Sequence, residues 1–207
     1  QSTRAKSVFL STLSHEIRTP LNGVIGMTQL IMNTDLNQEQ AEYASIANSS
    51  GKVLLALLND ILDFSKIEAG KVQITKKAFD FRVVIKEVID SFKSTAETRG
   101  NVLTSKIDDA IPSFLIGDSA HLKQVLYNIV GNALKFTRNG SCKLTAEIYS
   151  QENDDKLDCC DILFKVEDTG IGIAEDKIAT IFDSFSQAHS STKRTYEGTG
   201  LGLAITQ

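Results

Sequence analysis

Residues 9–21 have the sequence FLSTLSHEIRTPL, in which apolar residues recur at the spacing of one face of a helix. Leu13, Ile17 and Leu21 share that face, so we expect these three side chains to point inward and His15 to point toward solvent. The stretch therefore predicts a long amphipathic helix that carries an exposed histidine.

The same periodicity continues after this stretch. It is interrupted by a turn-rich segment at residues 33–37, and a second apolar stripe runs from Tyr43 to Phe64 before Gly70 ends it. Two helices of ~30 residues would each be about 45 Å long. One hairpin cannot bury two stripes of this width, so we expect a homodimer through residues 1–70 that forms a four-helix bundle.

Helical and β-like patterns intermix from Lys71 to the last residue, which is typical of an α+β domain. Asp80 and Asp118 stand where the N-caps of two helices are expected. The expected helices cover residues 80–98, 119–136, 174–182 and 201–207, and the expected strands cover residues 72–75, 102–107, 142–149 and 161–167. We therefore divide the chain into a domain of residues 1–70 and a domain of residues 71–207.

The composition excludes several classes of protein. With 42% hydrophobic residues the chain is too apolar for a disordered protein, and its net charge of −4 includes no basic arm that would suggest a nucleic-acid partner. No uninterrupted apolar run approaches the ~20 residues of a membrane-spanning helix. The three cysteines lack metal-ligand spacing and fit reduced thiols, so we expect this portion to be cytoplasmic, with membrane attachment through other segments left open.

His15 has neighbours that suit nucleophilic chemistry. Glu16 adjoins it, and Thr19 lies one turn further on the same side of the helix. Pro20 has no N–H to donate to the carbonyl of Glu16, so we expect the helix to bend or loosen there. An imidazole is a competent nucleophile when a carboxylate holds or removes the proton on its other nitrogen. An ordinary surface histidine is the alternative that these residues alone leave open.

A polar face interrupts the apolar helix that we expect at residues 119–136. Asn128 and Asn132 are four residues apart, and Lys135 follows at the next turn of the same face. Two amides and an ammonium group are costly to bury unless they meet a polar partner. Neutral oxygen ligands beside a cation suit Mg²⁺ bound to a triphosphate, while a hydrogen-bonded polar ladder is the alternative.

Two glycine clusters follow later in the chain. Residues 168–172 (DTGIG) come directly after an expected strand, and residues 198–202 (GTGLG) precede an expected helix. Glycines let backbone N–H groups approach a phosphate or a base closely, and a helix N-terminus favours an anion. The second cluster lacks the strand and spacing of a dinucleotide fingerprint, and the chain has no Walker A sequence. Either cluster alone is a weak signal, since a glycine turn is usually only a turn.

Together and in this order, these segments resemble the transmitter core of sensor histidine kinases, especially the hybrid kinases of two-component phosphorelays. The resemblance covers nearly the whole chain, with an H box at 9–21, an N box at 128–137, a G1 box at 168–172, an F box at 181–185 and a G2 box at 198–202. It implies a long helical hairpin that forms a dimeric four-helix bundle for dimerisation and histidine phosphotransfer. An α/β-sandwich ATP-binding domain of the Bergerat type would follow, truncated at its C-terminal end.

The resemblance also implies roles for single residues. His15 would be the phosphoacceptor and Glu16 its general base, and Thr19 would position water during dephosphorylation of a receiver domain. Lys135 would reach phosphate, Phe136 would lie against the adenine and Asp168 would accept its amino group. The remaining implied ATP contacts are Asn128 and Asn132, which would also bind Mg²⁺, Gly170 and Gly172 along the adenine wall, and Gly198, Thr199, Gly200, Leu201 and Gly202 around the phosphates.

The chain departs from the family pattern at two places. Glu197 stands where many relatives have a small residue, and it adds a negative charge beside the phosphates. Ser186 and Gln187 stand where some members carry a basic residue of the lid. Lys193 or Arg194 would have to replace that residue at the γ-phosphate.

The resemblance implies an ATP-dependent protein-histidine kinase that passes its phosphoryl group to a receiver-domain aspartate, in cis or in trans. The alternatives are an ATP-binding pseudokinase that scaffolds partners as a dimer and a Bergerat-fold ATPase. Related ATPases carry a glutamate base four residues before the metal-binding asparagine. Asn128 occupies that position here and cannot take a proton, which disfavours hydrolysis.

Overall fold

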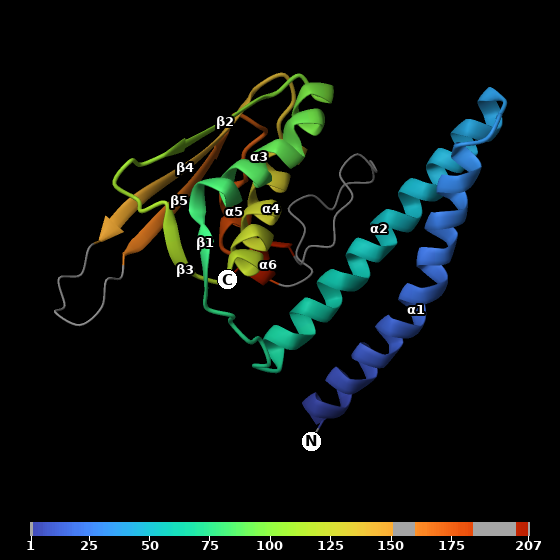
Figure 1. Ribbon diagram of the computed structural model, residues 1–207, viewed down its shortest axis with the longest axis horizontal. Helices are drawn as coiled ribbons and strands as arrows, with labels where there is room; N and C mark the ends of the chain where they lie inside the picture. Colours follow the sequence, from blue (N-terminus) through green and yellow to red (C-terminus); the bar gives the residue numbers. More distant parts are fainter. Residues whose placement is uncertain (1, 151–159, 184–201, 207) are drawn as a thin grey trace. The chain divides into compact units, whose positions relative to one another are not determined.

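A computed structural model describes residues 2–150, 160–183 and 202–206 of the chain. It divides into two compact units, one built on residues 2–72 and the other on residues 73–150 and 160–183. The first unit is a hairpin of two long helices, α1 (Ser2–Met32) and α2 (Gln38–Glu68) (Figure 1). None of the helices in the described part of the chain is long and apolar enough to cross a membrane.

Local signals define the ends of the hairpin helices. Asn37 caps α2, since its side chain accepts a hydrogen bond from the amide of Gln40 at 2.8 Å. The side chain of Gln40 accepts one from the amide of Asn37 at 3.1 Å, which completes a capping box. The helix α1 continues through Pro20 rather than ending there. The expected loosening at this proline therefore does not divide α1 into two helices.

The interface between α1 and α2 is built from small and polar side chains. Asn48 is 4% exposed and donates hydrogen bonds to the carbonyl of Ile25 at 3.0 Å and to Oγ1 of Thr28 at 2.9 Å. Gly51 packs so closely that a Cβ there would lie 2.8 Å from Cγ1 of Ile25. Contrary to the expected inward orientation, Leu13 is exposed in the hairpin, whereas Ile17 and Leu21 are half-buried.

Large apolar side chains consequently remain on the outside of the hairpin. Leu54, for example, is 50% exposed and Ile46 is 55% exposed. The exposed apolar residues are Leu13, Val24, Met27, Leu30, Ile31, Met32, Tyr43, Ile46, Val53, Leu54, Ile61 and Ile67. A single hairpin therefore leaves much of its apolar surface in water.

The second unit places two helices, α3 (Phe81–Thr98) and α4 (Ser119–Phe136), against one face of a three-stranded sheet (Figure 1). Its strand order is β2-β4-β5, with β2 (Val102–Ile107) parallel to β4 (Ser141–Ser150) and β5 (Asp161–Asp168) antiparallel to β4. The short strands β1 (Lys77–Asp80) and β3 (Phe114–Gly117) pair separately. A further short helix of this unit is α5 (Glu175–Ile178), and the last described helix along the chain is α6 (Gly202–Thr206).

The core of the second unit lies between these helices and the sheet. Side chains of β5 alternate between exposed and half-buried, as expected for a strand with one covered face. Phe81 of α3 is fully buried, and its ring centroid lies 5.9 Å from that of Phe164 on β5. The buried apolar residues of α3, α4 and β4 are Phe81, Val84, Ile85, Val88, Ile89, Ala96, Leu126, Val130, Ala133, Leu134, Cys142, Leu144 and Ala146.

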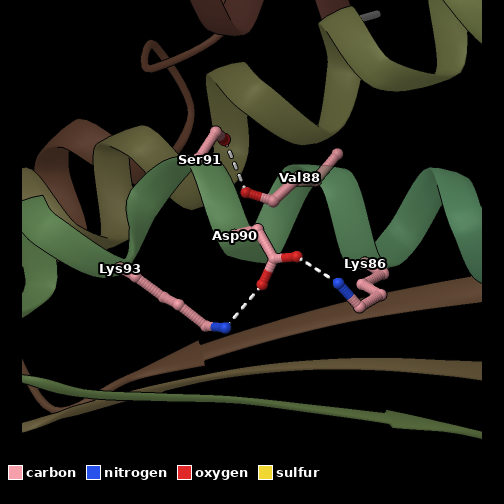
Figure 2. A network of polar contacts seen from close by, with 5 residues as sticks. All are labelled: Lys86, Val88, Asp90, Ser91 and Lys93. Carbon is pink, nitrogen blue, oxygen red and sulfur yellow. Dashed lines mark hydrogen bonds and ion pairs between the residues drawn. The ribbon is translucent and has the colours of Figure 1, made fainter.

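The outer face of α3 is charged. Asp90 lies between two lysines, and its carboxylate oxygens are 2.5 Å from Nζ of Lys86 and 2.6 Å from Nζ of Lys93 (Figure 2). The hydrogen bonds from Lys86 and then Lys93 lower the pKa of Asp90 to about 2. This triplet stabilises successive turns of the exposed helix face.

The segment that enters the second unit differs from the expectation. Residues 72–75 do not form the expected strand. The strand forms further along the chain, at Lys77–Asp80, because these residues pair with β3. The amide of Thr75 donates instead to Oδ2 of Asp118 at 2.8 Å. Asp118 also caps α4 by accepting from the amides of Ala120 and His121 at 3.1 and 3.0 Å. Backbone donors from Thr75 and His121 hold the pKa of Asp118 well below its usual range.

Two other expectations are wrong in extent. The helix expected at 174–182 is helical only at Glu175–Ile178, and turns follow it. The strand Phe114–Gly117 was not expected at all, since four residues carry too little periodicity.

Candidate functional site

The polar face of α4 carries the first group of expected site residues. Asn128, Asn132, Lys135 and Phe136 are all half-buried, whereas their helix neighbours Val130 and Leu134 are packed in the core. Nζ of Lys135 lies 5.1 Å from the centroid of the Phe136 ring. Burial, and secondarily the nearby Arg99 guanidinium, lowers the pKa of Lys135. A half-buried cation beside an aromatic ring is suited to an anionic ligand that also has a flat apolar part.

The last turn of α4 meets the end of β5. The amide of Ile171 donates to the carbonyl of Phe136 at 3.3 Å. Asp168, the last residue of β5, accepts at Oδ1 from the amide of Gly170 at 2.9 Å and from Oγ1 of Thr137 at 3.4 Å. The structure thus brings together the expected residues Phe136, Asp168 and Gly170, which are far apart in the sequence.

Glycine is required at residue 170 by close packing. A Cβ there would lie 2.6 Å from the carbonyl oxygen of Phe136 and 2.8 Å from Oδ1 of Asp168. Gly172 is required for a different reason, because its φ of +69° is left-handed. The two glycines allow the backbone after Asp168 to turn tightly against α4.

The carboxylate of Asp168 is held at one oxygen and remains exposed. Both of its hydrogen bonds named above use Oδ1, which leaves Oδ2 to accept from an amino group of a ligand. Cys142, opposite Asp168 on β4, is buried, and burial raises the pKa of its thiol to about 11. The thiol therefore stays protonated near neutral pH.

Sequence reasoning missed three residues at this site. Thr137 closes the quoted N box, yet its buried hydroxyl gains a role only when β5 places Asp168 beside it. Arg99 and Asn101 follow α3, outside every motif, and they bind backbone carbonyls at the end of α4. The sequence signals this turn by Gly100, directly after the end of α3, and by the basic residue that precedes this glycine.

The asparagines of α4 suit a metal ion that takes only a few of its ligands from the protein. The amide oxygen of Asn132 and that of Asn128 are hard, neutral ligands that Mg²⁺ accepts, and one turn of helix separates them. They provide at most two ligands, which fits an ion that takes its other ligands from phosphate and water. No cluster of three or more His, Cys, Asp or Glu able to hold a metal occurs among the described residues.

The second group of expected site residues lies on α1. His15 is part of that helix, and Glu16 and Thr19 are exposed on it. Gly202 is the first residue of α6. The other expected phosphate-binding and lid residues lie outside the described residues; they are Lys193, Arg194, Gly198, Thr199, Gly200 and Leu201.

Two families match this chain. Residues 5–70 match the His Kinase A (phospho-acceptor) domain, and residues 117–207 match the family of histidine kinase-, DNA gyrase B- and HSP90-like ATPases. The signal transduction histidine-protein kinase BarA of Escherichia coli is 42% identical over 207 residues, which is 100% of this chain and 22% of BarA. The sensory/regulatory protein RpfC of Xanthomonas campestris pv. campestris is 42% identical over 204 residues, or 99% of this chain and 28% of RpfC.

A solved structure shares the fold. The crystal structure of full-length ShkA in complex with AMPPNP has a TM-score of 0.74 and 37% sequence identity, and it covers 95% of this chain and 39% of ShkA. This chain spans less than a third of the length of the curated relatives named above.

Proposed function

Because this chain belongs to the histidine kinases of two-component signal transduction and carries their transmitter core, we propose that it autophosphorylates His15 with ATP. In this proposal residues 1–70 form the dimerisation and phosphotransfer domain, and residues 71–207 form the ATP-binding domain. The phosphoryl group then passes to a receiver-domain aspartate, as the resemblance to hybrid kinases implies.

The meeting of α4 with the turn after β5 is the observation that carries the proposal. The free oxygen of Asp168 would accept the adenine amino group, and the ring of Phe136 would lie against the base. Lys135 would reach the phosphates from the same helix end. The AMPPNP complex of ShkA supports a nucleotide of this kind.

Asn132 and Asn128 would hold Mg²⁺, with phosphate and water completing its coordination. The bound ion would neutralise the charge that develops on the phosphate oxygens during transfer. Lys135, in the last turn of the same helix, adds a positive charge for the phosphates.

The chemistry on α1 requires a nucleophile and a base. A nitrogen of the His15 imidazole forms a bond to the γ-phosphorus of ATP while the bond from that phosphorus to the bridging oxygen of ADP breaks. The proton on the other ring nitrogen passes to Glu16, which is exposed beside His15. Thr19 would position water when the same helix assists dephosphorylation of a receiver.

The exposed apolar side chains of the hairpin support the proposed homodimer. Burial of Ile46, Val53, Leu54 and Ile61 against a second copy would remove apolar surface from water, which a single hairpin cannot do. Since ATP is the proposed substrate, we also expect this portion of the protein to work in the cytoplasm.

Labelling with [γ-³²P]ATP and Mg²⁺ tests the proposal. The chain should acquire a label that is lost in acid and survives base, as phosphohistidine does. His15→Gln should abolish this label, and His121→Gln, a matched change of a histidine in the second unit, should retain it. Nucleotide binding without any label would favour a pseudokinase, and release of free phosphate without labelled protein would favour an ATPase.

A further inference from the structure

The turn after α3 reaches the end of α4 from outside every motif of the sequence. Arg99, the C-cap residue of α3, donates from Nη1 to the carbonyl of Lys135 at 2.7 Å and to the carbonyl of Leu134 at 3.3 Å. Carbonyls in the last turn of a helix have no partner within the helix. Arg99 therefore completes the hydrogen bonding of the turn that presents Lys135 and Phe136.

The backbone around Arg99 is held in place on both sides. Gly100 has a φ of +68°, and a Cβ there would overlap Oδ1 of Asn139. Asn101 is 7% exposed, donates to the carbonyl of Thr137 at 2.8 Å and accepts from the amide of Gly140 at 3.0 Å. The amide of Asn139 also donates to the carbonyl of Arg99 at 3.0 Å. The residues that follow α4 are thus fixed to the residues that follow α3.

The charge of Arg99 also matters at this place. The C-terminal end of a helix carries a partial negative charge, which would repel the phosphates proposed to lie beside Lys135. A guanidinium bonded to those carbonyls offsets the repulsion. Arg99 and Lys135 are two cations at one helix end, an arrangement that an anionic ligand relieves.

We propose that Arg99 is a positioning residue for the nucleotide, which fixes the last turn of α4 and offsets the negative helix end beside the phosphates. This inference rests on the proposed function, and it predicts a larger effect on ATP than on adenosine. Arg99 lies outside the residues 117–207 that match the ATPase family.

Calorimetric titration of the whole chain with MgATP and with adenosine tests the inference. Arg99→Gln should lower ATP affinity roughly tenfold, since it loses a charged donor and the offset of the helix end. Arg99→Lys keeps the charge but not the planar fork of donors, so its loss should be only about threefold. Both variants should bind adenosine with less change than ATP. Arg138→Gln is the matched control, because it removes one exposed positive charge three residues after Lys135.

Several results would overturn the inference. One is parent-like ATP affinity in Arg99→Gln, and another is a loss of ATP affinity in Arg138→Gln that equals the loss in Arg99→Gln. In either case, ATP binding by the parent chain would leave the proposed function intact. A parent chain that binds no ATP would refute the proposed function and this inference with it. If circular dichroism shows that Arg99→Gln does not fold, Arg99→Lys decides, and an unchanged ATP affinity there overturns the inference.

Discussion

Replacing Gly170 by alanine tests whether the tight turn after β5 and the end of α4 form one nucleotide site. The new Cβ would lie 2.6 Å from the carbonyl oxygen of Phe136, 2.8 Å from Oδ1 of Asp168 and 2.9 Å from the carbonyl carbon of Phe136. Ordinary contacts of a Cβ begin at 3.4 Å, so one side must move by about 0.8 Å. Two of the three contacted atoms belong to the backbone, and the movement therefore reaches the last turn of α4.

The size of the effect follows from these contacts. Overpacking of this kind costs about 1–3 kcal/mol, and displacement of Asp168 weakens its hydrogen bond from the amide of residue 170. We expect the second unit to lose about 2 kcal/mol, which lowers its melting temperature by about 7 °C. Because the displaced Phe136 and Asp168 are the proposed adenine contacts, we expect ATP affinity to fall roughly tenfold, which corresponds to about 1.4 kcal/mol of binding free energy.

Thermal unfolding followed by circular dichroism and titration with MgATP measure the two effects. Gly117→Ala is the matched control, since its Cβ would meet only the ring of Phe79, at 3.4 Å. We expect that variant to change stability by less than about 0.5 kcal/mol and to leave ATP affinity unchanged. Parent-like melting and parent-like ATP affinity in Gly170→Ala would refute this reasoning.

Three further predictions concern other parts of the chain. Leu54→Asp places a carboxylate on the exposed apolar side of α2, so this variant should be monomeric in light scattering while the parent has twice the monomer mass; a dimeric variant would count against the proposed interface. Asp90 should titrate near 2 in carboxyl NMR, and a midpoint near 4 would contradict its contacts with Lys86 and Lys93. Because the pKa of Asp90 is lower in the folded than in the unfolded state, its stabilising contribution is complete above about pH 4 and is lost as the pH falls to 2. Glu16→Gln should reduce autophosphorylation about 10²–10⁴-fold at unchanged ATP affinity, whereas Thr19→Ala should slow only receiver dephosphorylation; equal losses in both assays would indicate a damaged helix turn.

Elements with strong local signals could be predicted from the sequence. The expected helix at 119–136 and strand at 102–107 agree with α4 and β2, and Asp118 caps α4 as expected. Apolar periodicity and an N-cap are properties of a few neighbouring residues, which is why they can be read directly. The short strands β1 and β3 exist only through their mutual pairing, and that pairing joins residues more than 30 positions apart.

The side chains of the candidate site could be predicted from the sequence, but the contacts that bring them together could not. Lys135, Phe136 and Asp168 could be named from their motifs, and their roles remain predictions. The contacts that join them involve backbone atoms, such as the carbonyl of Phe136 and the amide of Ile171, which any sequence supplies. Arg99 likewise acts on carbonyls, so no pattern of partner side chains could reveal it.

The candidate site and the connection between β4 and β5 lie at opposite ends of these two paired strands. Cys142 lies opposite Asp168 at one end, and Ser150 lies opposite Asp161 at the other, about 25 Å away at the rise of a strand. The segment between Ser150 and Asp161 can therefore grow in length without moving Asp168 or α4. This connection is accordingly the place where an affinity tag or a reporter domain could be inserted into the chain with its nucleotide site intact.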